Sequence, residues 1–95
     1  MHTTVRKYDN VPNPRDAGRR VNDEFLPQIS KLPGFVAYNF TDAGSGTMFS
    51  TTVFDDKAGA DESTKKAAEW AKQNPGVFPA SPTITVGEVV SYKSK

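Results

Sequence analysis

Residues 34–55, GFVAYNFTDAGSGTMFSTTVFD, decide the fold of this 95-residue chain. They hold two runs rich in β-branched and aromatic residues, 34–41 and 47–55, joined by a five-residue link with two glycines at 42–46. This link connects two β-rich runs and opens no helix, so its composition favours a hairpin turn over a phosphate-binding loop. The segment therefore predicts two neighbouring antiparallel strands.

The residues before this hairpin predict a helix with a break in it. The helix begins at Pro14, after Asn13 as its N-cap, and continues to about Lys31 with apolar residues at helical spacing. Pro27 has no N–H to donate to the carbonyl of Asp23. We therefore expect a kink near Pro27 or a separate last turn.

The residues on either side of these elements predict a second helix and two outer strands. The second helix covers 57–73 and has a stripe of small side chains with Trp70 at its edge, so it can lie close to a sheet. The first strand is expected over 3–8. The last is expected over 83–93, where only Gly87 interrupts a long β-prone run.

The resulting order is β-α-β-β-α-β, which is typical of ferredoxin-like folds. We therefore predict an α+β domain over residues 1–95, with a four-stranded antiparallel sheet and two helices on one of its faces. In this fold the first strand lies beside the fourth.

Apolar side chains are predicted on both faces of the sheet. In the third strand, for example, Met48 and Phe54 point to one face while Phe49 and Val53 point to the other. Two helices on one side leave the second face uncovered. We therefore expect a second copy of the chain to cover it, giving a homodimeric α/β barrel.

The composition narrows the possible functions. The formal net charge is +1 without a block of like charge, so neither a nucleic acid nor a membrane is expected as a partner. The chain has no cysteine, which excludes disulfides, zinc–thiolate sites and cysteine nucleophiles. Its one histidine is His2, so no metal site is predicted. With no apolar run long enough to cross a membrane, a cytoplasmic location is the expectation.

Glu88 breaks an apolar pattern in the last predicted strand, because its neighbours two and four positions away are apolar. With the first strand beside the fourth, Arg6 is its nearest candidate partner. Two interpretations stay open. The pair is either a structural ion pair, or a functional one in which Arg6 orients an anionic substrate or Glu88 acts as a base.

Several segments resemble the small dimeric α/β-barrel proteins grouped with antibiotic biosynthesis monooxygenases. These are VRKY at 5–8, LPGFVAY at 32–38, AEW at 68–70 and PTITVGEVV at 82–90. The resemblance covers nearly the whole chain. It implies a homodimer with a ligand-sized cavity between the sheet and the helices of each subunit.

The resemblance also implies candidate site residues. Cofactor-free oxygenases of this family surround their substrate with an asparagine, a tryptophan and tyrosines, and this chain offers Asn39, Trp70, Tyr38 and Tyr8. Haem-degrading relatives place a histidine on the second helix, but residues 57–73 contain none. Haem breakdown is therefore not expected.

Two functions follow as hypotheses. The first is a monooxygenase without metal or cofactor that acts on a small apolar or aromatic compound, with Glu88, Arg6 and Asn39 as catalytic candidates and Trp70, Tyr38 and Tyr8 as substrate-binding candidates. The alternative is a non-catalytic homodimeric domain for ligand binding or scaffolding. A cavity of about 300 Å³ with converging polar groups favours the first, and a packed interior favours the second.

Overall fold

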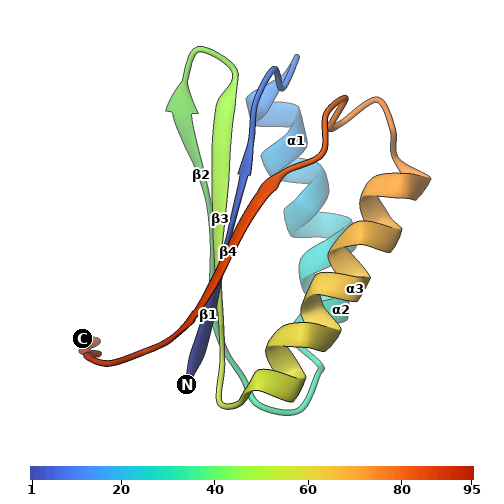
Figure 1. The fold of residues 1–95 in the computed structure, drawn as a ribbon. Coiled ribbons are helices and arrows are strands. Elements are labelled where there is room, and N and C mark those ends of the chain that lie inside the picture. The colour runs from blue at the N-terminus through green and yellow to red at the C-terminus, as the bar shows by residue number, and fades with distance from the viewer.

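The computed structural model covers residues 1–95 and places two helical regions on one face of a four-stranded antiparallel sheet (Figure 1). The elements are β1 (His2–Tyr8), α1 (Pro14–Arg20), η1 (Val21–Phe25), α2 (Leu26–Ile29), β2 (Phe35–Gly44), β3 (Thr47–Phe54), α3 (Lys57–Gln73) and β4 (Thr83–Glu88). The sheet order is β2-β3-β1-β4, so the first strand lies beside the fourth as predicted. The ferredoxin-like α+β fold is confirmed. No helix combines the length and the apolar composition that crossing a membrane requires.

The first helical region is divided, as the proline predicted. Asn13 caps it, with its Oδ1 accepting from the backbone N–H of Asp16 at 3.3 Å. The α-helix then widens into the π-helical turn η1, where the N–H of Leu26 donates to the carbonyl of Val21. Pro27 lies in the first turn of the short helix that follows, where a missing N–H leaves no bond unmade.

The second helix lies close to the sheet because it carries small residues at the contact. Asp56 caps it by accepting from the N–H of Gly59 at 2.9 Å. A Cβ on Gly59 would lie 2.5 Å from Cδ1 of Phe54, so a larger residue there requires a shift of the helix or of the Phe54 ring. The buried residues of α3 are Ala60, Ser63, Ala67 and Trp70.

The prediction of a last strand reaching residue 93 is wrong. β4 ends at Glu88, which is opposite His2, the first residue of β1. One further bond joins the N–H of Val89 to the carbonyl of Met1 at 2.8 Å. Beyond that point β1 offers no further residue to pair with. The β-prone segment after Val89 therefore forms no strand, and Val90 is 94% exposed. In Figure 1 this tail extends away from the body of the molecule.

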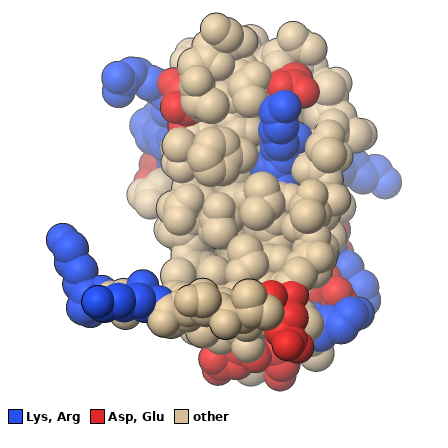
Figure 2. All heavy atoms as spheres, turned by 60° about the vertical axis from the view of Figure 1, so that its left-hand side comes forward, with Lys and Arg blue, Asp and Glu red and all other residues tan.

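The two faces of the sheet differ in how they are covered. The face toward the helices carries the core, which includes Tyr8, Met48 and Trp70. The opposite face has no element over it, and Figure 2 shows few charged atoms across its middle. Residues on this open face include Thr3, Val5, Lys7, Ala37, Asn39, Thr41, Phe49, Thr51 and Val53.

Candidate functional site

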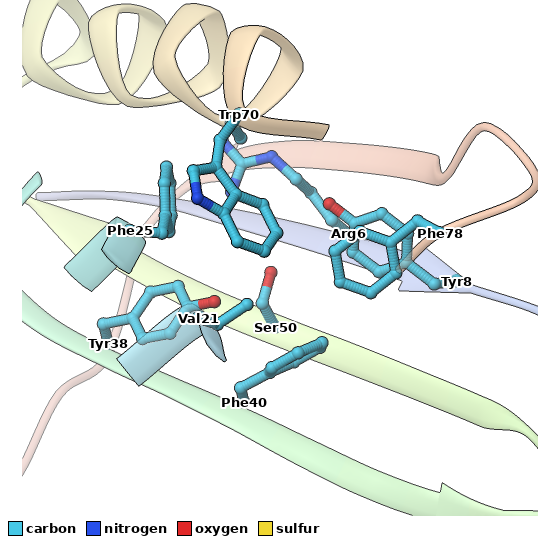
Figure 3. A pocket seen from close by; sticks show the side chains of 10 residues that line it. Arg6, Tyr8, Val21, Phe25, Tyr38, Phe40, Ser50, Trp70 and Phe78 are labelled. Atoms are coloured by element: carbon cyan, nitrogen blue, oxygen red, sulfur yellow. The ribbon is translucent and has the colours of Figure 1, made fainter. Parts of the chain in front are cut away.

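A small pocket lies between the sheet and the helices (Figure 3). Its free volume is about 10 Å³, which is room for one water molecule. Ten residues line it, and eight of them are hydrophobic. They are Arg6, Tyr8, Val21, Phe25, Tyr38, Phe40, Ser50, Ala67, Trp70 and Phe78.

Arg6 brings a positive charge to this pocket from the middle of β1. Its side chain is buried, with only 2% of the residue exposed. Nη1 donates to Oγ1 of Thr52 at 3.3 Å and Nη2 donates to Oγ1 of Thr64 at 2.9 Å. No carboxylate lies within 4.0 Å, and the Nε–H has no acceptor. Burial lowers the pKa of the guanidinium, the response expected of a charge removed from water.

Two tyrosines add phenol groups beside this charge. Tyr8 stacks on Phe78 with ring centroids 4.1 Å apart, and Tyr38 meets Phe25 edge-on at 6.2 Å. Burial raises the pKa of Tyr8 and raises that of Tyr38 strongly, although the charge of Arg6 opposes both shifts. Both phenols are therefore neutral near neutral pH and can donate a hydrogen bond.

Trp70 closes the pocket on the helix side. It is 5% exposed, and Figure 3 shows its indole pointing from α3 toward the sheet between Phe25 and Phe78, at centroid distances of 6.2 and 6.1 Å. On its outer side the Arg20 guanidinium lies 5.7 Å from the ring centroid. Arg20 is itself held by Glu24 at 3.0 Å, so the indole is fixed from both sides.

The structure brings four of the six predicted site residues together: Arg6, Tyr8, Tyr38 and Trp70. The expected pairing of Arg6 with Glu88 is wrong. Arg6 is opposite Ile84, whereas Glu88 is exposed at the end of the strand, four residues further along. The register of β1 against β4 therefore separates the two charges.

Asn39 also lies outside the pocket. It is opposite Thr51 on the open face of the sheet, where it is exposed, and its Oδ1 accepts from the hydroxyl of Thr41 at 3.5 Å. Alternation along β2 turns the next residue, Phe40, into the pocket instead.

Sequence reasoning missed six of the ten pocket residues as site residues: Val21, Phe25, Phe40, Ser50, Ala67 and Phe78. Val21 and Phe25 reach it from the two ends of the π-helical turn η1, a geometry that a helical-spacing argument does not anticipate. Phe78 comes from the loop between α3 and β4, where no periodicity marks it. The one signal for Phe78 is that it is the only aromatic residue in the loop at 74–82. No cluster of three or more His, Asp or Glu side chains is placed to hold a metal ion.

Comparison of the chain with known proteins gives matches in structure only. No family model matches the sequence, and no curated protein matches it. Among solved structures, a protein of unknown function from Nitrosomonas europaea has a TM-score of 0.78 at 19% identity, with 99% of this chain and 93% of that one covered. A monooxygenase from Streptomyces coelicolor, solved with the ligand nanaomycin D, has a TM-score of 0.77 at 11% identity and coverages of 99% and 91%.

A third structure, of an antibiotic biosynthesis monooxygenase, has a TM-score of 0.70 at 16% identity, with 96% of this chain and all of that chain covered. Such low identities establish a common fold and do not extend to activity. The chain has the ferredoxin-like α+β fold of antibiotic biosynthesis monooxygenase-like proteins, so the resemblance noted in the sequence is confirmed for the fold.

Proposed function

We propose that the chain is a monooxygenase that needs no bound cofactor and acts on a small aromatic compound in the pocket between sheet and helices. The observation that carries this proposal is the convergence of Arg6, Tyr8, Tyr38 and Trp70 on one apolar site. The shared fold of the monooxygenase solved with nanaomycin D supports it.

The reaction that suits such a site draws its electrons from the substrate. An acidic CH₂ group next to an aromatic ring gives a proton to a water molecule, and the carbanion combines with O₂. The peroxide anion takes the proton back, and the hydroperoxide formed loses water. The net change is CH₂ + O₂ to C=O + H₂O, which requires no external reductant. The protein has to exclude water, hold the ring and stabilise the anion.

Trp70 and Tyr38 would hold the ring, and Arg6 would stabilise the anion. Glu88 and Asn39 have no part in this proposal because they lie outside the pocket.

A ligand must widen the pocket to enter it. Two surface grooves share lining residues with it and offer a route. One, of about 310 Å³, contains Tyr8 and Phe78, and the other, of about 360 Å³, contains Val21 and Tyr38. Rotation of the Phe78 ring would join the first groove to the pocket, because this ring is stacked on Tyr8 between the two spaces.

The proposal includes a second copy of the chain on the open face of the sheet. The side chains there include half-buried Val5 and Phe49, and Lys7 is the only charged residue among them. An apolar face of this kind favours a self-complementary contact.

One observation favours the alternative, a homodimeric domain that binds or scaffolds without catalysis. The free volume of about 10 Å³ is far below the ~300 Å³ of an ordinary ligand pocket. In this alternative Trp70 and the tyrosines are core residues.

The test is a ligand screen followed by oxygen uptake. The fluorescence of Trp70, the only tryptophan, and the melting temperature are recorded with phenols, hydroquinones and flat aromatic acids, with haem as a control. Saturable quenching with a raised melting temperature, then consumption of O₂ by the bound compound, is the expected result. A folded dimer that responds to no compound supports the non-catalytic alternative.

A further inference from the structure

Arg6 is a buried charge without a counter-charge. The nearest titratable groups facing it are Tyr8 and Tyr38, which are neutral phenols, and no carboxylate lies within 4.0 Å. A lone charge in a protein interior is strongly unfavourable unless a partner of opposite sign offsets it. The chain therefore maintains an arrangement that an anion would stabilise.

The guanidinium is held in a fixed position by hydroxyl groups on two elements. Thr52 of β3 accepts from Nη1. Thr64 of α3 accepts from Nη2, and its own hydroxyl donates to the carbonyl of Ala60 at 3.1 Å, which fixes the direction of the hydroxyl. These contacts use one N–H of each Nη, whereas the buried Nε has no partner at all. Of the five N–H donors of the guanidinium, three are thus left over, and the Nε–H is the one on a wholly unpartnered nitrogen.

The other polar groups of the pocket are also able to donate. The phenols of Tyr8 and Tyr38 and the hydroxyl of Ser50 share it with Arg6, and no carboxylate lines it. The rest of the lining is apolar and largely aromatic. Such a lining is complementary to a flat ring that carries an oxygen acceptor.

Resting on the pocket assigned under the proposed function, we infer that Arg6 binds an anionic oxygen, a carboxylate or an ionised phenol, on a flat aromatic ligand. The ring lies against Trp70, and the free Nε–H of Arg6 donates to the anion. The charge on the ligand thus decides which aromatic compounds bind.

The first test compares ligands of one shape and different charge. Binding of 2-naphthoate and of the neutral 2-naphthamide is titrated without oxygen by calorimetry and by Trp70 fluorescence. We expect 2-naphthoate to bind at least about tenfold more tightly, the order of one charge-assisted hydrogen bond. Binding of 4-nitrophenol on either side of its own pKa separates a phenolate from a carboxylate as the preferred anion. Equal affinity for 2-naphthoate and 2-naphthamide overturns the inference.

The second test removes the charge from the protein. In Arg6→Met we expect the preference for 2-naphthoate to vanish while the melting temperature stays level or rises, because an apolar side chain replaces an uncompensated buried charge. Arg6→Lys keeps part of the preference. Lys7→Met is the matched control, because it removes the same charge from the neighbouring residue on the open face. A preference that survives in Arg6→Met overturns the inference. If Arg6→Met fails to fold, the affinities of the wild type and of Arg6→Lys for 2-naphthoate and 2-naphthamide still test the inference.

The two proposals fail separately. A clear preference for 2-naphthoate without O₂ consumption by any bound compound contradicts the monooxygenase and leaves the anion site in place. Oxygen consumption with equal binding of the charged and neutral ligands contradicts the anion site alone.

Discussion

The two faces of the sheet are built from alternate residues of the same strands, yet each is incomplete in a different way. On β1, Arg6 points to the helices and is buried, while its neighbours Val5 and Lys7 lie on the open face. The helix side has apolar cover but lacks a negative charge. The open side carries few charges but lacks apolar cover. We propose a different partner for each face, a small anion on the helix side and a second copy of the chain on the open side.

Of the substitutions that compare the two faces of the sheet, those on the covered face should lower the free energy of unfolding most. Phe54 is fully buried against Phe35 and Gly59, so Phe54→Ala should lower the free energy of unfolding by about 3–5 kcal/mol. Phe49 on the open face is half-buried, so Phe49→Ala should lower the free energy of unfolding of the monomer by clearly less. Denaturant titration at low protein concentration measures both. Equal losses would mean that the open face is as well packed as the core.

The open face should control assembly. Phe49→Lys places a second positive charge beside Lys7, its partner across β1 and β3. We expect self-association to weaken at least tenfold, about 1.4 kcal/mol or more, with an unchanged circular dichroism spectrum. Light scattering over a dilution series gives the mass. A wild-type chain that is monomeric at all concentrations would refute the dimer.

The two buried tyrosines of the covered face should make the free energy of unfolding fall at high pH. Burial raises the pKa values of Tyr8 and Tyr38, so above about pH 10 these phenols ionise in the unfolded chain while the folded chain keeps its protons. The stabilisation is complete below pH 10 and falls as pH rises, by about 1.4 kcal/mol per pH unit for each phenol. Unfolding titrations between pH 8 and 11 measure the slope. Tyr38→Phe should reduce it.

The smallest effect is expected at Glu88. Its side chain is exposed at the end of β4, opposite His2, so Glu88→Gln should change the free energy of unfolding by less than about 0.5 kcal/mol. Affinity for 2-naphthoate should also stay unchanged. A variant that stays folded and loses ligand binding would return Glu88 to the site.

The arrangement of the sheet could be predicted because local signals agreed. Asn13 and Pro27 mark the start and the break of the first helical region, and the link at 42–46 marks the hairpin. The structure confirms the cap, the separate last turn and the hairpin, but the link is shorter than predicted: residues 42–44 belong to β2, and only Ser45 and Gly46 separate the two strands. These features depend on a few neighbouring residues, and a sequence displays such features directly.

The failed predictions depend on contacts between distant segments. Arg6 and Glu88 both lie in alternating strands, and a shift of two or four residues leaves the alternation intact, so the pattern did not specify the register. β4 ends where β1 begins, a limit set by its neighbour and not by its own β-prone sequence. Phe78 joins the pocket only through the path of its loop.

The short β4 leaves an exposed edge to the sheet. Along Thr83–Glu88 only one side of the strand is paired, and the β-prone tail that follows is free. Exposed edges of this type promote strand addition between molecules and, at high concentration, aggregation. Gly87 within the strand and the lysines at 93 and 95 are features that oppose it. The last thirteen residues are therefore the part of the chain in which solubility and assembly compete most directly.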